Sequence, residues 1–184
     1  EELDILKQQS TEMKTHWGVL GLFGAVITLL LVAYISFGLP IACGSHGCIR
    51  QTDVAAQRAY DSAFARFTNA RDTSEQATLT TLVRRYLLTH ASTTSSVSSD
   101  DAARYRTDIL HTTDGIAAKK LGFSSFEEYD TVVLIPFLTQ EALMKQRGIT
   151  SPSVLYKQLA QEQRIFLFKK GYMWDRSNGE VVAK

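Results

Sequence analysis

The pattern of apolar positions divides the chain into two unequal parts. Residues 17–39 read WGVLGLFGAVITLLLVAYISFGL, in which 17 of 23 side chains are apolar and none is charged. A helix of that length covers roughly 34 Å, enough for the ~30 Å hydrocarbon core of a bilayer. Trp17 and Tyr34 lie near its ends, where interfacial aromatic residues are common. Since cleaved signal peptides carry shorter apolar stretches, the pattern predicts a retained single-pass transmembrane helix.

This helix sets the domain organisation that we expect. Residues 1–16 are an N-terminal flank, and residues 17–39 cross the membrane. Residues 40–51 are a linker that contains both cysteines, and residues 52–184 form a helical domain.

Beyond residue 52 the apolar side chains recur at helical spacing. The pattern predicts six helical stretches, over residues 53–70, 75–91, 99–111, 115–121, 126–147 and 152–163. Pro136 lies inside the fifth stretch, where its ring removes a backbone donor and predicts a kink or a break. The Ser- and Thr-rich residues 91–99 are expected to form a loop.

Two of these helices carry clear apolar faces. The stretch over 75–91 is expected to bury Leu79, Leu82, Val83, Tyr86 and Leu87, with His90 as a core-rim histidine at the edge of that stripe. Arg84 and Arg85 lie off it. By the same spacing, the stretch over 53–70 is expected to bury Ala56, Tyr60, Ala63, Phe64 and Phe67.

The C-terminal residues change to a strand-like pattern. GYMWD and EVVAK flank a predicted turn at Ser177-Asn178-Gly179, which indicates a hairpin. The predicted fold class is therefore mainly α. It comprises a single N-terminal transmembrane helix and a soluble domain of five or six packed helices with a small C-terminal β-hairpin.

Charge and motifs narrow the function. The chain holds 20 basic and 19 acidic residues, a balance that argues against a nucleic-acid partner. It contains no GxSxG, HExxH, GxGxxG or phosphate-binding glycine loop. The acidic pairs Asp100-Asp101 and Glu127-Glu128 fall in predicted first helical turns, where they complement the helix dipole. We therefore expect no catalytic residue, no cofactor and no metal site, and a protein that is not an enzyme.

Cys43 and Cys48 are the only cysteines, and they bracket the short stretch CGSHGC. Three alternatives remain open for this stretch. A disulfide requires an oxidising compartment and would place the C-terminal domain outside the cytoplasm. A metal site could use both cysteines and His46, but it lacks a nearby fourth ligand. Two free thiols are the third alternative. We favour the disulfide.

The order of elements resembles a known family. The segments TLTTLVRRYLLTHA, VSSDDAARYRTDIL and LGFSSFEEYDTVVLIPFLTQEAL follow one another, and a Ser-rich loop separates the first two. This progression resembles the N-terminal peptide-binding domain of SurA-type periplasmic chaperones, over roughly residues 48–165. The resemblance implies packed helices that hold unfolded exported chains. Members often also carry a parvulin-type prolyl isomerase domain, for which too few residues follow Gln163, so we expect no isomerase activity. The family's binding surface is not a short motif, so the residues of a peptide groove remain unassigned.

We therefore expect a membrane-tethered, extracytoplasmic domain that binds unfolded or exported polypeptide without catalysis. Its partners would be the lipid bilayer and the client chains. The alternative is a single-span structural or accessory subunit of a multi-protein membrane complex, whose partners would be the other subunits.

Overall fold

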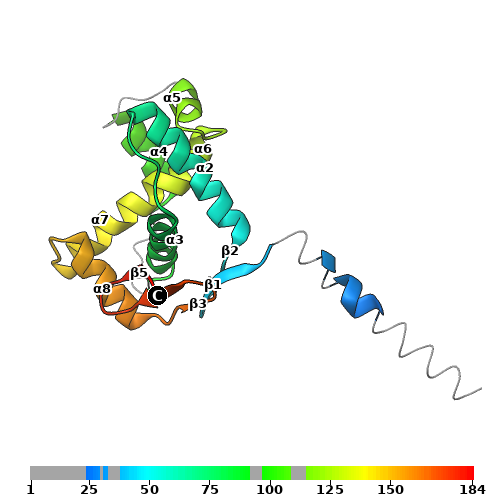
Figure 1. Ribbon diagram of the computed structural model, residues 1–184. Helices are drawn as coiled ribbons and strands as arrows, with labels where there is room; N and C mark the ends of the chain where they lie inside the picture. Colours follow the sequence, from blue (N-terminus) through cyan, green and yellow to red (C-terminus); the bar gives the residue numbers. More distant parts are fainter. Residues whose placement is uncertain (1–23, 30, 33–37, 92–96, 109–114) are drawn as a thin grey trace, which may run out of the picture. The chain divides into compact units, whose positions relative to one another are not determined.

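The computed structural model describes residues 24–29, 31–32, 38–91, 97–108 and 115–184 (Figure 1). The chain divides into two compact units, Glu1–Leu39 and Pro40–Lys184. In the first unit, residues 24–29 and 31–32 are helical. The second unit contains the strands and the other described helices.

The predicted transmembrane helix over residues 17–39 is corrected by the structure. Spanning ~30 Å of hydrocarbon takes about 20 helical residues, whereas residues 24–29 cover only about 9 Å. In the described part of the chain, no helix combines the length and the apolar character that crossing a membrane requires. Residues 17–23, 30 and 33–37 of the predicted span lie outside the described residues.

The second unit is mainly helical, as the periodicity predicted. Among the described residues it has seven α-helices: α2 (Gln51–Thr68), α3 (Glu75–Thr89), α4 (Ser99–Asp108), α5 (Gly115–Lys120), α6 (Phe126–Tyr129), α7 (Ile135–Arg147) and α8 (Pro152–Glu162). The number exceeds the predicted five or six because the stretch over 126–147 is divided. A π-helical turn, η1 (Asp130–Leu134), separates α6 from α7. In Figure 1, α4, α5 and α6 gather at one end of this unit, and the strands lie at the other.

In the part of the chain that the structure describes, five short strands form two sheets. The predicted C-terminal hairpin is confirmed as β4 (Tyr172–Asp175) paired with β5 (Glu180–Ala183). The other sheet has the order β2-β1-β3 and was not predicted. Its strands are β1 (Pro40–Gly44), β2 (Gly47–Arg50) and β3 (Phe166–Leu167). Thus the stretch expected to be a linker is a β-hairpin, completed by a strand from far downstream.

The β1–β2 hairpin carries both cysteines. Cys43 lies directly opposite Cys48 in the antiparallel register, and the structure joins the two in a disulfide. The hairpin is fastened to α3 because the backbone N–H of His46 donates to the Tyr86 hydroxyl at 2.9 Å. Gly44 permits this close approach, since a Cβ at that position would lie 2.5 Å from the same hydroxyl oxygen.

The hydrophobic core is centred on α3. Five of the six side chains in its predicted stripe are buried, namely Leu79, Leu82, Val83, Tyr86 and Leu87, and His90 at the edge of the stripe is half-buried. The five buried side chains pack in one cluster with side chains from α2, α7, α8 and β5, including Val54, Leu143, Leu155, Leu159 and Val181. Burial of these side chains supplies most of the driving force for the folding of this unit.

The face predicted for α2 is partly wrong. Phe64 and Phe67 are 55% and 60% exposed, and Ala56 is also exposed. The helix instead buries Val54, Gln57 and Ala65. The apolar spacing is genuinely helical, but the neighbouring elements cover a different side of the helix.

Substitution within the core tests the role of α3. Leu87→Ala should lower the free energy of unfolding by about 2–5 kcal/mol, because it removes a fully buried side chain and leaves a cavity. Phe67→Ala removes a larger but exposed side chain and should cost less than about 1 kcal/mol. Urea denaturation of the full chain measures both. Equal losses for the two variants would contradict the central position of α3.

Candidate functional site

A surface groove lies between α2, α3 and the helical stretch formed by η1 and α7. We call it the arginine groove, because two adjacent arginines of α3 line it. Its main hollow has a volume of about 470 Å³. The side chains around it are Gln57, Thr81, Arg84, Arg85, Leu88, Val132, Val133, Pro136, Phe137, Gln140, Pro152 and Tyr156.

Two smaller hollows adjoin the arginine groove. They have volumes of about 330 Å³ and 180 Å³. Gln57, Arg85 and Val132 line both of them as well as the main hollow. The three hollows therefore share one central segment, so a ligand in the main hollow can extend toward either neighbour.

One wall of the groove is apolar and partly exposed. Val133 and Phe137 have 37% and 43% of their surface exposed, and Pro136 lies between them. Pro136 lacks a backbone N–H, and the chain reaches it through the π-helical turn η1 rather than through a regular α-helix. Val132 and Val133 belong to this irregular turn and line the edge of the groove.

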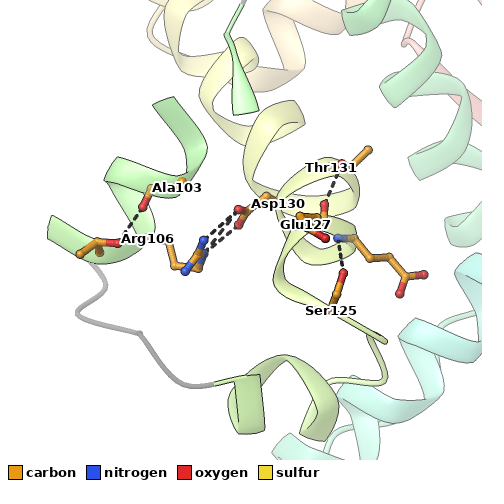
Figure 2. Close-up of polar contacts among 8 residues, drawn as sticks. Ala103, Arg106, Ser125, Glu127, Asp130 and Thr131 are labelled. Atoms are coloured by element: carbon orange, nitrogen blue, oxygen red, sulfur yellow. Dashed lines mark hydrogen bonds and ion pairs between the residues drawn. The ribbon is translucent and has the colours of Figure 1, made fainter. Parts of the chain in front are cut away.

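A buried ion pair holds η1 in place. The guanidinium of Arg106 on α4 contacts both carboxylate oxygens of Asp130, with Nε–Oδ1 and Nη2–Oδ2 distances of 3.1 Å and 3.2 Å (Figure 2). Asp130 is only 5% exposed. The same guanidinium lies 4.1 Å from the centre of the Phe126 ring, a cation–π geometry. Because these partners come from α4, α6 and η1, one charged group fixes three elements behind the apolar wall.

The preceding turn is capped by its own side chains. The Ser125 hydroxyl accepts from the Glu128 N–H at 3.2 Å, and Thr131 donates its hydroxyl to the Glu127 carbonyl at 2.7 Å (Figure 2). Glu128 also accepts hydrogen bonds from Ser124, chiefly through the hydroxyl, which lowers the pKa of its carboxyl. Tyr60 of α2 donates its hydroxyl to this carboxylate, which raises the pKa of Tyr60 to about 12. These contacts fasten α6 to α2.

The floor of the groove is a chain of polar side chains. Arg85 donates through Nη2 to the Gln57 side-chain oxygen at 2.7 Å. Gln57 then donates to Asp61 Oδ1, and Thr78 donates to Asp61 Oδ2, both at 2.9 Å. Burial lowers the pKa of Arg85, and the nearby Asp61 carboxylate opposes that shift. An arginine keeps its charge under such a shift, so the floor presents a fixed cation.

Arg84 forms the other part of the floor. It donates through Nε to the Gly179 carbonyl at 3.0 Å, and its guanidinium lies 4.8 Å from the centre of the Tyr156 ring. The Tyr156 hydroxyl donates to the Gln140 side-chain oxygen at 2.6 Å. Burial raises the pKa of Tyr156, against the opposing effect of Arg84, so its hydroxyl stays a neutral donor. The turn of the β4–β5 hairpin and the face of the Tyr156 ring thus orient the Arg84 side chain.

The main hollow of the groove is positively charged, whereas Asp53 and Asp61 line the two smaller hollows. Among the described residues, none of the side chains that line its main hollow is acidic, whereas Arg84 and Arg85 both line it. Apolar side chains stand beside these guanidinium groups and the amides of Gln57 and Gln140. Such a surface can accept an extended chain, since guanidinium and amide N–H groups bind carbonyl or carboxylate oxygens and the wall covers an apolar side chain.

The residues singled out in the sequence fall partly at this site. Cys48 lines the 330 Å³ hollow through the β1–β2 hairpin. His46 stacks on His90, with ring centres 5.0 Å apart. Across the described residues, no group of three or more His, Cys, Asp or Glu is arranged to hold a metal ion. No groove residue was assigned from the sequence. The available signal was the pair Arg84-Arg85, next to the stripe that the helix buries.

The ion pair behind the wall can be tested by removing its cation. Arg106→Gln leaves the Asp130 carboxylate buried without that guanidinium and should cost about 3–5 kcal/mol of unfolding free energy. Arg104→Gln on the same helix alters an exposed side chain and should change it by less than about 0.5 kcal/mol. Chemical denaturation of the two variants compares them directly. A small, equal effect would show that the ion pair does not hold η1.

Comparisons of the chain with protein-family models, with curated proteins and with solved structures found no match. The resemblance to SurA-type chaperones therefore remains a prediction. The geometry and charge of the arginine groove carry the functional proposal.

Proposed function

We propose that the second unit binds extended segments of unfolded or exported polypeptide in the arginine groove, without catalysis and without a cofactor. The observation that carries this proposal is the pairing of a partly exposed apolar wall with a polar floor. Val133 and Phe137 form the wall, and Arg84 and Arg85 belong to the floor.

A polypeptide suits both surfaces at once. Its backbone carbonyls accept hydrogen bonds from guanidinium and amide groups, and its apolar side chains pack against the wall. An extended chain can also continue from the main hollow into its neighbours, since all three share Gln57, Arg85 and Val132. Contacts of this kind are individually weak, which suits a domain that releases its client without ATP.

The disulfide supports the choice of compartment. Disulfides persist in oxidising environments and are rare in the cytosol. Since Cys43 and Cys48 are joined in the hairpin beside the groove, we propose that the domain works outside the cytoplasm, where exported chains arrive unfolded.

A second candidate function is that of an accessory subunit in a larger assembly. The observation that favours it is a pair of exposed aromatic side chains, Phe166 and Phe168, each 61% exposed. Phe166 lies in β3 and Phe168 follows directly after it, and β3 is an edge strand of the three-stranded sheet. Edge strands can pair with another chain. Docking by this edge leaves the arginine groove free, so the two functions use different surfaces.

A matched pair of valine variants tests the proposed function. The full chain in several-fold molar excess should suppress the aggregation of a chemically unfolded test protein, followed by light scattering. Val133→Asn should weaken this suppression about fivefold, because it removes roughly 1 kcal/mol of apolar contact from the wall. Val154→Asn should leave it unchanged, since Val154 is similarly exposed, at 45%, but does not line the groove.

Two results would count against polypeptide binding in the groove. One is the absence of any suppression by the wild-type chain. The other is an equal loss in both valine variants, which would move binding away from the wall. Capture of one stoichiometric partner, in place of many unfolded chains, would favour the accessory-subunit function instead.

A further inference from the structure

We infer that the arginine groove selects polypeptide segments in which a carboxylate adjoins an apolar side chain, with Arg85 as the residue that determines this specificity. The inference rests on the proposed function and adds to it the chemistry of the preferred segment. It is carried by the charge of the groove and by the state of the groups around Arg85.

Arg85 occupies the centre of the site. Its side chain lines all three hollows, and it is half-buried rather than fully solvated. A guanidinium has five N–H donors, of which Nη2 bonds the neutral amide of Gln57. Within the described ranges, no carboxylate lies at ion-pair distance from Arg85. A partly desolvated cation with a neutral partner gains most from an incoming anion.

The two carboxylates nearest Arg85 are engaged elsewhere. Asp61 accepts hydrogen bonds from Gln57 on one oxygen and from Thr78 on the other. Asp53 accepts the backbone N–H of Arg50 at 2.7 Å, as part of the cap of α2. Asp53 lines the 330 Å³ hollow and Asp61 the 180 Å³ hollow, so they moderate the positive charge there, but neither lies at ion-pair distance from the Arg85 guanidinium.

Arg84 adds a second cation to the main hollow. Its Nε is bonded to the Gly179 carbonyl and its plane is supported by the Tyr156 ring, so its position is fixed before any ligand binds. Preorganised guanidinium groups lose little entropy when they bind a carboxylate. Together with Arg85, it makes the hollow complementary to an acidic segment.

The apolar part of the preference follows from the opposite wall. Val133 and Phe137 remain partly exposed beside the same hollow that the two arginines line. A segment that combines glutamate or aspartate with a bulky apolar residue therefore satisfies both sides of the groove. A purely acidic segment would leave the wall uncovered, and a purely apolar one would leave the cations unpaired.

Three matched peptides test this specificity on the full chain. Each is fluorescently labelled and carries two phenylalanines around a central pair of glutamates, glutamines or lysines, and fluorescence anisotropy measures the dissociation constants. The glutamate peptide should bind about tenfold more tightly than the glutamine peptide, because each charge-assisted hydrogen bond is roughly twice as strong as a neutral one. The lysine peptide should bind most weakly.

Variants locate the effect. Arg85→Gln should remove most of the difference between the glutamate and glutamine peptides, since only Arg84 then remains as a cation in the main hollow, while leaving the affinity for the glutamine peptide within about twofold. Arg85→Lys keeps the charge and should restore part of the difference. Arg71→Gln, which alters an exposed arginine in the loop between α2 and α3, is the matched control and should change nothing. Thermal unfolding shows that each variant is folded.

Salt gives a second readout that needs no variant. Raising the ionic strength shortens the screening length. The glutamate peptide should therefore bind less tightly, with an affinity that approaches that of the glutamine peptide. Equal binding of the two peptides by the wild type would overturn the inference while leaving polypeptide binding intact. A loss of the difference in Arg71→Gln as large as that in Arg85→Gln would overturn it too. Failure of all three peptides to bind would overturn the proposed function as well.

Discussion

The burial of one face of α3 is the constraint on which the second unit depends. Leu79, Val83 and Leu87 are almost completely excluded from solvent, in contact with a core to which α2, α7, α8 and β5 contribute. Since side chains on a helix are fixed in angle relative to one another, burying this stripe also fixes the direction of the neighbouring arginines. Arg84 and Arg85 therefore line the groove as a consequence of packing. The core is the reason why the floor is preorganised.

The wall of the groove depends on a second, local constraint. Pro136 cannot donate a backbone hydrogen bond, and the helix that leads to it contains a π-helical turn. Such turns are costly unless the surroundings stabilise them, and here the buried pair between Arg106 and Asp130 does so from α4. Removing one partner of a buried pair costs more than the pair itself contributes. The buried ion pair between Arg106 and Asp130 thus keeps the apolar wall of the groove in place.

The sequence was informative wherever periodicity and capping act locally. It predicted the helices, the buried stripe of α3 and the C-terminal hairpin. It failed where contacts are remote in sequence: β1 pairs with β3 from far downstream, and none of the described elements covers the side of α2 that exposes Phe64. The membrane prediction came from the length and apolar character of residues 17–39, and no described helix combines the two features that it requires. The groove could not be predicted, because its lining comes from four helices and a π-helical turn.

In the function that we propose, polypeptides bind between the apolar wall and the two arginines. The most direct measurement is methyl NMR of the valine side chains in the full chain, during titration with a chemically unfolded polypeptide. We expect the methyl signals of Val132 and Val133 to shift in a saturable manner, while those of Val154 on α8 stay in place. Shifts at Val154 with none at Val132 or Val133 would contradict that expectation and would move the binding surface to another face of the domain.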